Sequence, residues 1–90
     1  MPDITTLVFT TEFLQSLLVG KWSEKERKRF DAALALLDTN EKHPSLRMHQ
    51  LKRDMRGQWS ASASHDLRIT FERLDDGRKR LLECSRHYGD

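Results

Sequence analysis

The feature of the sequence that most constrains its fold is an alternation of apolar and polar side chains between residues 58 and 72. Successive side chains of a β-strand point to opposite faces of the sheet, so an alternation of period two is typical of a half-buried strand. A polar interruption at His65 and Asp66 predicts a turn between two such strands. In the second strand, Arg68 falls on the face opposite to the apolar side chains. The apolar positions are Trp59, Ala61 and Ala63 in the first strand and Leu67, Ile69 and Phe71 in the second.

The part of the chain before this segment has an apolar repeat close to 3.6 residues, which predicts two helices. The first helix can be capped by Thr10 or Thr11 and is expected to end at Gly20, because glycine commonly follows the last helical turn. The second helix begins at a capping box of Ser23 and Glu26. The apolar stripes are Phe13, Leu14, Leu17 and Leu18 in the first helix and Phe30, Ala33, Leu34 and Leu37 in the second.

Two more strands complete the expected sheet. Residues 4–10 are rich in β-branched side chains and predict a buried first strand. A hairpin turn at residues 75–77 leads into a last strand at residues 80–86, where Leu81 and Leu82 indicate burial on both faces. The order along the chain is β-α-α-β-β-β. The expected fold class is α+β: a small, mostly antiparallel sheet with two helices on one face, in a single domain of residues 1–90.

The composition indicates a soluble globular protein, with 37% hydrophobic and 33% charged residues. The single cysteine, Cys84, excludes an internal disulfide, and we expect a cytoplasmic protein without metal, cofactor or membrane segment. The formal net charge is only +2, but all four histidines and 11 of the 16 Lys and Arg residues lie in residues 41–90. A polyanion would therefore bind this second half of the chain.

Several short motifs in the second half resemble those of the RelE superfamily of bacterial toxins. Residues 43–52 look like the corresponding run of these toxins, and residues 57–60 resemble the family's glycine, aromatic and serine step. Residues 66–71 resemble its strand with an arginine before hydrophobic residues. Residues 84–88, which end in a histidine and a tyrosine, resemble the YoeB branch. The order and spacing of these motifs carry the resemblance, and the expected β-α-α-β-β-β order agrees with the family fold.

The resemblance implies an endoribonuclease that cleaves mRNA on the translating ribosome and is neutralised by a cognate antitoxin. RNA is cut without a metal when its 2′-hydroxyl attacks the adjacent phosphate, which requires a general base, a general acid and cations. The matching positions assign His49 as general base, as in the YafQ branch, Arg68 as the phosphate-stabilising cation and His87 as general acid.

Four further residues are expected to bind RNA. Lys52, Arg53 and Arg56 supply positive charge for mRNA or ribosomal RNA phosphates, and Tyr88 can stack on a base. His43 and His65 are assigned to turns. RelE itself has lysines where this chain has Ser60 and Ser62, so the YoeB-like or YafQ-like variant of the chemistry is preferred.

Two other functions fit the same fold, because a fold does not determine a function. A ParE-like toxin would inhibit DNA gyrase and would not need the set of His49, Arg68 and His87. A non-catalytic RNA- or antitoxin-binding module is the second alternative. The expected assemblies are a homodimer or a hetero-oligomer of toxin and antitoxin.

Overall fold

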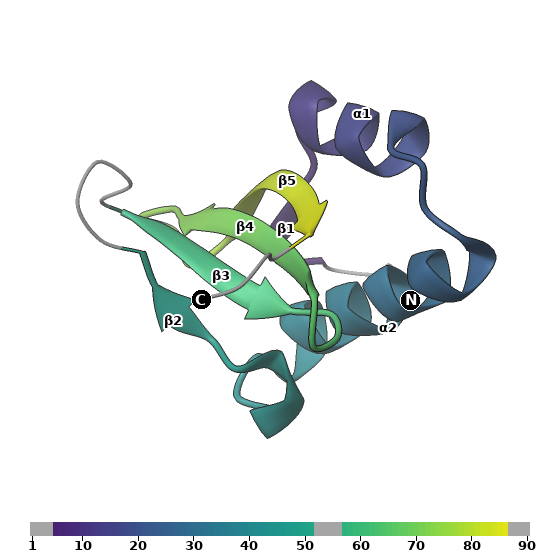
Figure 1. The fold of residues 1–90 in the computed structure, drawn as a ribbon. Coiled ribbons are helices and arrows are strands. Elements are labelled where there is room, and N and C mark those ends of the chain that lie inside the picture. The colour runs from purple at the N-terminus through teal and green to yellow at the C-terminus, as the bar shows by residue number, and fades with distance from the viewer. Residues whose placement is uncertain (1–4, 52–56, 87–90) are drawn as a thin grey trace.

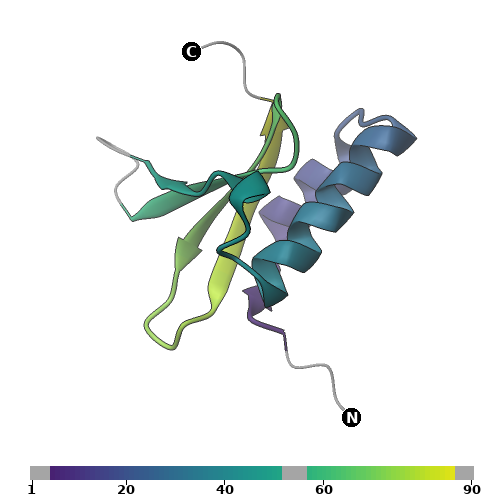
Figure 2. The ribbon, with the colours of Figure 1, turned by 90° about the horizontal axis from the view of Figure 1, so that it is seen from below.

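The computed structural model, which describes residues 5–51 and 57–86, contains a five-stranded sheet with both helices on one of its faces (Figures 1 and 2). The order of the strands across the sheet is β1-β5-β4-β3-β2. β1 pairs in parallel with β5, and the other neighbours are antiparallel. The expected α+β fold is confirmed. The elements are β1 (Leu7–Val8), α1 (Thr11–Val19), α2 (Glu24–Thr39), the short 3₁₀ helix η1 (Pro44–Leu46), β2 (His49–Gln50), β3 (Gln58–Ser62), β4 (Leu67–Arg73) and β5 (Lys79–Arg86).

The hairpin of β3 and β4 has the register that the alternation predicts. Trp59 lies opposite Phe71 and Ala61 opposite Ile69, so these apolar side chains share the face covered by the helices. Phe71, Ile69 and Ala61 are fully buried there. Polar side chains occupy the other face, which we call the open face of the sheet.

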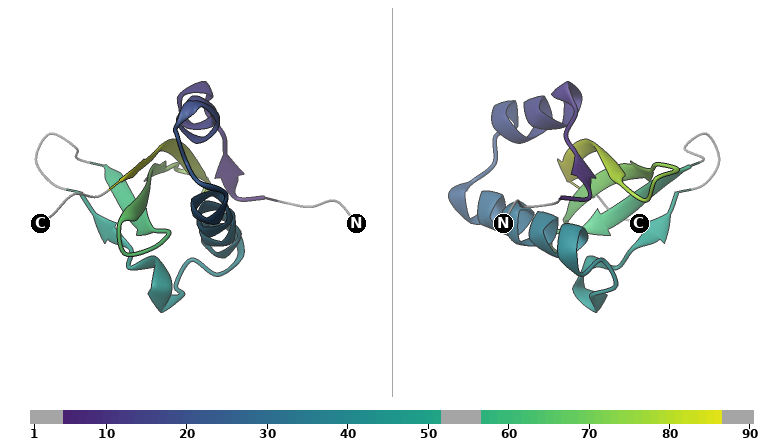
Figure 3. Two further views of the ribbon diagram at one scale, coloured as in Figure 1. Left: turned by 45° about the vertical axis from the view of Figure 1, so that its right-hand side comes forward. Right: turned by 180° about the vertical axis from the view of Figure 1, so that it is seen from behind.

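The structure contains one strand that the sequence did not predict. β2 consists of two residues and pairs with β3, with His49 opposite Ser60 and Gln50 opposite Trp59. Two exposed polar residues show no alternation, so only their pairing with β3 makes them a strand. η1 leads from the end of α2 into β2, which forms one edge of the sheet (Figure 3).

The other differences are at β1 and β5, which pair with each other. β1 is limited to Leu7–Val8 within the described part of the predicted segment 4–10, because Thr10 is used to cap α1. The prediction of burial on both faces of β5 is wrong for Leu82, which is only partly buried. The register shifts between Thr70 and Phe71, which lie opposite Glu83 and Leu81, and this leaves Leu82 without a partner.

Both helices begin as predicted. The hydroxyl of Thr10 accepts a hydrogen bond from the Phe13 amide at 3.0 Å, and both bonds of the capping box between Ser23 and Glu26 are present. Phe13 on α1 and Phe30 and Leu37 on α2 are fully buried against the sheet. Within residues 5–51 and 57–86, neither helix is long and apolar enough to cross a membrane.

A buried lysine links the first strand to the last. Lys79 is 2% exposed, and its Nζ donates to the Thr6 hydroxyl at 2.9 Å. The Thr6 amide and hydroxyl donate to the Asp38 carboxylate near the end of α2, at 2.6 and 2.9 Å. The pKa of Asp38 is lowered, first by its hydrogen bond from the Thr6 amide. These contacts hold β1, α2 and β5 together by satisfying a charge that would be costly to bury alone.

Gly20 follows α1 for a reason other than the expected one. Its φ of −59° and ψ of 143° are available to any residue, so no left-handed turn requires a glycine here. Instead, the indole N–H of Trp22 donates to the Ser16 carbonyl at 2.8 Å and crosses the space where a side chain would start. A Cβ at Gly20 would lie 2.4 Å from Trp22 Nε1 and 2.5 Å from the Ser16 carbonyl oxygen.

We expect Gly20→Ala to lower the free energy of unfolding by about 1–3 kcal/mol, because the added methyl group displaces the Trp22 indole or the last turn of α1. Urea denaturation followed by circular dichroism measures this cost. The matched control is Val19→Ala, an exposed position in the same turn, which should change stability by less than about 0.5 kcal/mol. Equal stability of the two variants would contradict the steric explanation.

Candidate active site on the open face

The open face of the sheet brings together residues from four strands in two adjacent rows. His49, Ser60, Thr70 and Glu83 are opposite one another in the first row, across β2, β3, β4 and β5. Ser62, Arg68 and Ser85 form the second row, one pleat further along β3. Two of the predicted catalytic residues, His49 and Arg68, therefore lie on the same face.

The spacing between these two residues follows from the register. His49 and Arg68 are separated by two strand spacings across the sheet and two residues along it. Ordinary strand dimensions place their Cα atoms roughly 12 Å apart. Ser60 and Ser62 lie between them in the register and are only 5% and 7% exposed.

His49 is exposed and is oriented by the backbone two residues before it. Its Nδ1 lies 3.3 Å from the carbonyl oxygen of Arg47. A carbonyl can only accept, so a hydrogen bond here places the proton of a neutral ring on Nδ1 and leaves the lone pair on Nε2. Nε2 is then the atom that can accept a proton from a substrate.

Arg68 is held by backbone carbonyls and not by a carboxylate. Its Nη1 donates to the carbonyl oxygens of Ser64, His65 and Leu67, at 2.9, 3.0 and 3.1 Å. Glu72, a carboxylate on the same face of β4, is paired with Arg80 and not with Arg68. Among the described residues, Nε and Nη2 of Arg68 have no hydrogen-bond partner. The guanidinium is thus anchored by one nitrogen and keeps donors that can bind a phosphate.

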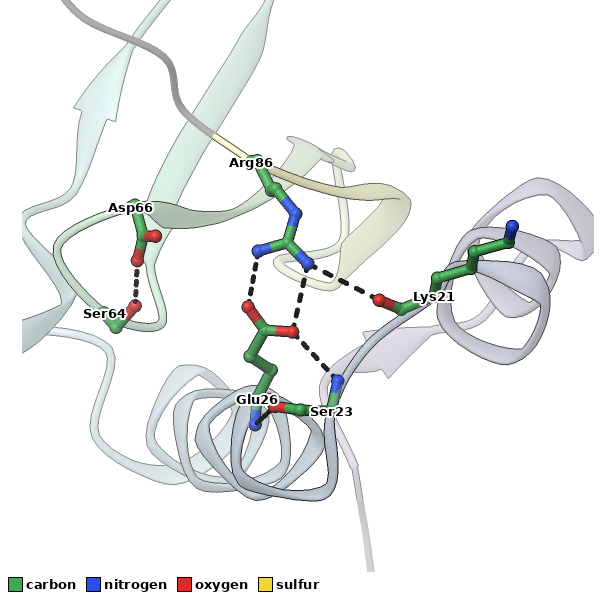
Figure 4. A network of polar contacts seen from close by, with 6 residues as sticks. All are labelled: Lys21, Ser23, Glu26, Ser64, Asp66 and Arg86. Atoms are coloured by element: carbon green, nitrogen blue, oxygen red, sulfur yellow. Dashed lines mark hydrogen bonds and ion pairs between the residues drawn. The ribbon is translucent and has the colours of Figure 1, made fainter.

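The end of β5 is tied to the start of α2 by Arg86 (Figure 4). Both terminal nitrogens of Arg86 contact the Glu26 carboxylate, and its guanidinium lies over the Trp22 ring, 4.8 Å from the centroid. Nη2 also approaches the Lys21 carbonyl oxygen at 3.5 Å. Glu26 and Arg86 are 60 positions apart, so no local pattern in the sequence indicates this pair. Arg86 is the last described residue of β5.

Several predicted site residues lie outside the described part of the chain. These are the general-acid candidate His87 and the RNA-binding candidates Lys52, Arg53, Arg56 and Tyr88. His43 and His65 lie in turns, as predicted, and His43 caps η1 by accepting the Ser45 amide at 3.2 Å. Within residues 5–51 and 57–86, no three His, Cys, Asp or Glu side chains are grouped so that they could hold a metal ion.

The ion pair of Glu26 and Arg86 should be visible in the acid stability of the protein. The Arg86 hydrogen bond, the Ser23 amide and the Arg86 charge lower the pKa of Glu26 from 4.5 to about 2, against a smaller opposing effect of burial. A carboxyl group whose folded-state pKa is lowered stabilises the fold above its unfolded pKa, and this stabilisation disappears as the pH falls through the folded value. The contribution is therefore complete above about pH 4.5 and lost toward about pH 2.

We expect Glu26→Gln to be less stable than the wild type at neutral pH, and the two proteins to converge as the pH falls from about 5 to about 2. The measurement is the midpoint of thermal unfolding across a pH series. Glu12→Gln, at a carboxyl group in the first turn of α1, is the control for the loss of one negative charge. A constant difference between Glu26→Gln and the wild type at all pH values would contradict the assigned pair.

Comparison with known proteins identifies the fold. No protein-family model matches the sequence, and no curated protein matches it at significant similarity. Several solved structures resemble the chain. YafQ from E. coli strain BL21(DE3) has a TM-score of 0.73 and 16% identity, covering 89% of this chain and 90% of YafQ. In the YoeB–YefM complex from Staphylococcus aureus, the matched chain has a TM-score of 0.68 and 19% identity, with coverage of 91% and 95%. The YoeB/ParE toxin from Agrobacterium tumefaciens has a TM-score of 0.64 and 20% identity, covering 91% of this chain and 98% of that toxin. The protein therefore has the fold of the RelE/ParE superfamily of toxins, in agreement with the resemblance of its sequence motifs.

Proposed function

We propose that this protein is the toxin of a type II toxin–antitoxin system and cleaves mRNA on the ribosome without a metal ion. The observation that carries the proposal is the position of His49 and Arg68 on one exposed face, although they come from different strands and are far apart in the sequence. The fold shared with YafQ and YoeB supports it. A base and a permanent cation on the same face of a sheet suit the transfer of a phosphoryl group between oxygen atoms.

The reaction follows from the chemistry of the three residues. Nε2 of His49 takes the proton of the RNA 2′-hydroxyl as that oxygen attacks the adjacent phosphorus. Arg68 stabilises the negative charge that builds up on the phosphate oxygens, using the donors that the turn carbonyls leave unoccupied. The bond from phosphorus to the 5′-oxygen breaks, and His87 donates the proton that this oxygen requires. The products are a 2′,3′-cyclic phosphate and a 5′-hydroxyl.

The proposal includes an antitoxin partner in the cytoplasm. Solved structures contain YafQ in complex with DinJ and YoeB in complex with YefM. We propose that an antitoxin likewise binds this chain and prevents access to the open face. The antitoxin complex, or a homodimer of the kind described for YoeB from Staphylococcus aureus, is the proposed assembly.

Substitution of the two histidines tests the proposed acid and base. We expect His49→Ala and His87→Ala each to slow mRNA cleavage in a purified translation system by about 10²–10⁴-fold, because each removes a proton-transfer group. The control is Arg80→Gln, which removes an arginine of the open face that is paired with Glu72. Full activity of both histidine variants would refute the assignment. Intact mRNA together with inhibition of DNA supercoiling by gyrase would support the ParE-like alternative instead.

Two substitutions distinguish a specific role of the Arg68 guanidinium from an effect of its positive charge alone. We expect Arg68→Ala to lower the single-turnover cleavage rate by about 10²–10³-fold, because charge stabilisation in the transition state is lost. Arg68→Lys should restore only part of the rate, because lysine keeps the charge but not the planar arrangement of donors. Circular dichroism of both variants shows whether the β3–β4 turn is intact. Equal rates for Arg68→Lys and the wild type would indicate that charge alone is needed.

A further inference from the structure

A second concentration of positive charge lies on the other face of the sheet. A hollow of about 390 Å³ is formed by the turn after α2, η1 with the residues that follow it, and the end of β4. Lys42, Arg47 and Arg73 line it, and Glu41 is the acidic residue in its lining. The Glu41 carboxylate is paired with Arg73 at 2.8 Å, so the charges of Lys42 and Arg47 are not balanced within the hollow.

The hollow is on the helix-covered side of the sheet, away from the row that contains His49. Arg73 lies on the same face of β4 as Phe71, and its guanidinium stacks over Trp59 and Phe71, 4.6 and 5.6 Å from their ring centroids. These rings and the Glu41 carboxylate hold the guanidinium in one orientation. A guanidinium held in this way is suited to planar hydrogen bonding with phosphate oxygens.

The backbone of Arg47 adopts a conformation that is strained for an arginine. Its φ is 44° and its ψ is 50°, and it is the one non-glycine residue with a positive φ in residues 5–51 and 57–86. This left-handed conformation is unfavourable for a residue with a Cβ, whereas glycine adopts it freely. Strain of this kind is often found at functional sites, where a side chain is needed in a fixed place.

The position of Arg47 connects the hollow to the proposed active site. Its carbonyl oxygen contacts Nδ1 of His49, and Arg47 also lines a larger hollow of about 770 Å³ between α2, η1 and the β3–β4 turn, which Arg68 borders. Arg47 and His49 lie about 7 Å apart along an extended chain. β2 is an edge strand of two residues, so a single nucleic-acid strand needs to pass only this edge to reach His49 from the hollow.

We infer that the hollow lined by Lys42, Arg47 and Arg73 binds phosphates of the RNA strand whose cleavable phosphate lies at His49 and Arg68. This inference rests on the proposed function and adds a binding site for the flanking part of the same strand. Arginine and lysine side chains bind RNA phosphates irrespective of sequence, so the hollow contributes affinity and direction, not base recognition.

The binding experiment uses a fluorescein-labelled 2′-O-methyl oligouridylate of about 12 nucleotides, which lacks the attacking hydroxyl and is not cleaved. Fluorescence anisotropy at several salt concentrations gives the affinity and its salt dependence. We expect Arg47→Gly to weaken binding by about three- to tenfold and to reduce the slope of log affinity against log salt by about 0.7, the value for one lost contact with a single strand. Thermal unfolding should show the same variant to be at least as stable as the wild type, because glycine relieves the strain.

Three further variants make the result specific. Arg47→Lys keeps the charge in the same strained position and should retain most of the affinity. Lys42→Gln should repeat the loss seen with Arg47→Gly. Arg27→Gln removes one charge from an exposed position of α2 outside the lining of both hollows, and should bind like the wild type.

The inference is overturned if the wild type does not bind the oligonucleotide at low salt, or if Arg47→Gly and Lys42→Gln bind it as the wild type does. It is also overturned if these variants lose binding of a polyglutamate peptide and keep that of RNA, since the hollow would then accept protein carboxylates. Cleavage of ribosome-bound mRNA by the same preparations separates the two proposals. If the wild type cleaves mRNA and Arg47→Gly binds RNA normally, this inference alone is refuted. If the wild type does not cleave mRNA but Arg47→Gly binds RNA more weakly, the proposed function alone is refuted.

Discussion

The burial of one face of β4 is the constraint on which the rest of the structure depends. β4 is the central strand, and its Leu67, Ile69 and Phe71 are at most 1% exposed beneath the two helices. A shift of one residue in its pairing would bring these side chains to the open face and place Arg68 in the core. The same hydrophobic burial that stabilises the fold therefore presents Arg68 on the face that also carries His49.

Around this strand, long-range polar contacts determine how the helices and the sheet meet. The Thr10 hydroxyl donates to the Leu81 carbonyl, and the Ser16 hydroxyl accepts from the Cys84 amide, so α1 is attached to β5 at two points. Cys84 itself is almost fully buried, and burial raises the pKa of its thiol to about 12. Arg86 and Glu26 then connect the last residue of β5 to the start of α2. The first two contacts pair backbone groups of Leu81 and Cys84, two residues that are buried in the core.

Arg68 and Arg73 lie on opposite faces of β4, and Arg47 lies just before β2. Arg68 lies on the open face. Arg73 lies on the helix-covered face, where aromatic rings and the Glu41 carboxylate contact its guanidinium. Arg47 lies just before β2, in a conformation that glycine would adopt more readily, and its carbonyl oxygen orients His49.

The sequence by itself determined the elements whose signals are local. The alternation from Trp59 to Phe71, the capping box of Ser23 and Glu26, and the turn at Gly77 each depend on neighbouring residues, and each is present in the structure. The side of β4 that carries Arg68 was predictable for the same reason. Motif resemblance, and not periodicity, indicated His49, because its two-residue strand has no pattern of its own.

Only the tertiary structure decided the features that depend on distant partners. The parallel pairing of β1 with β5, the register shift that leaves Leu82 unpaired, and the contact of Arg86 with Glu26 join segments far apart in the chain. The choice of backbone carbonyls over Glu72 as partners of Arg68 likewise follows from how the β3–β4 turn closes. Local patterns indicate which face of an element is buried. Strand neighbours and polar partners depend instead on which distant segments lie close together once the core has packed.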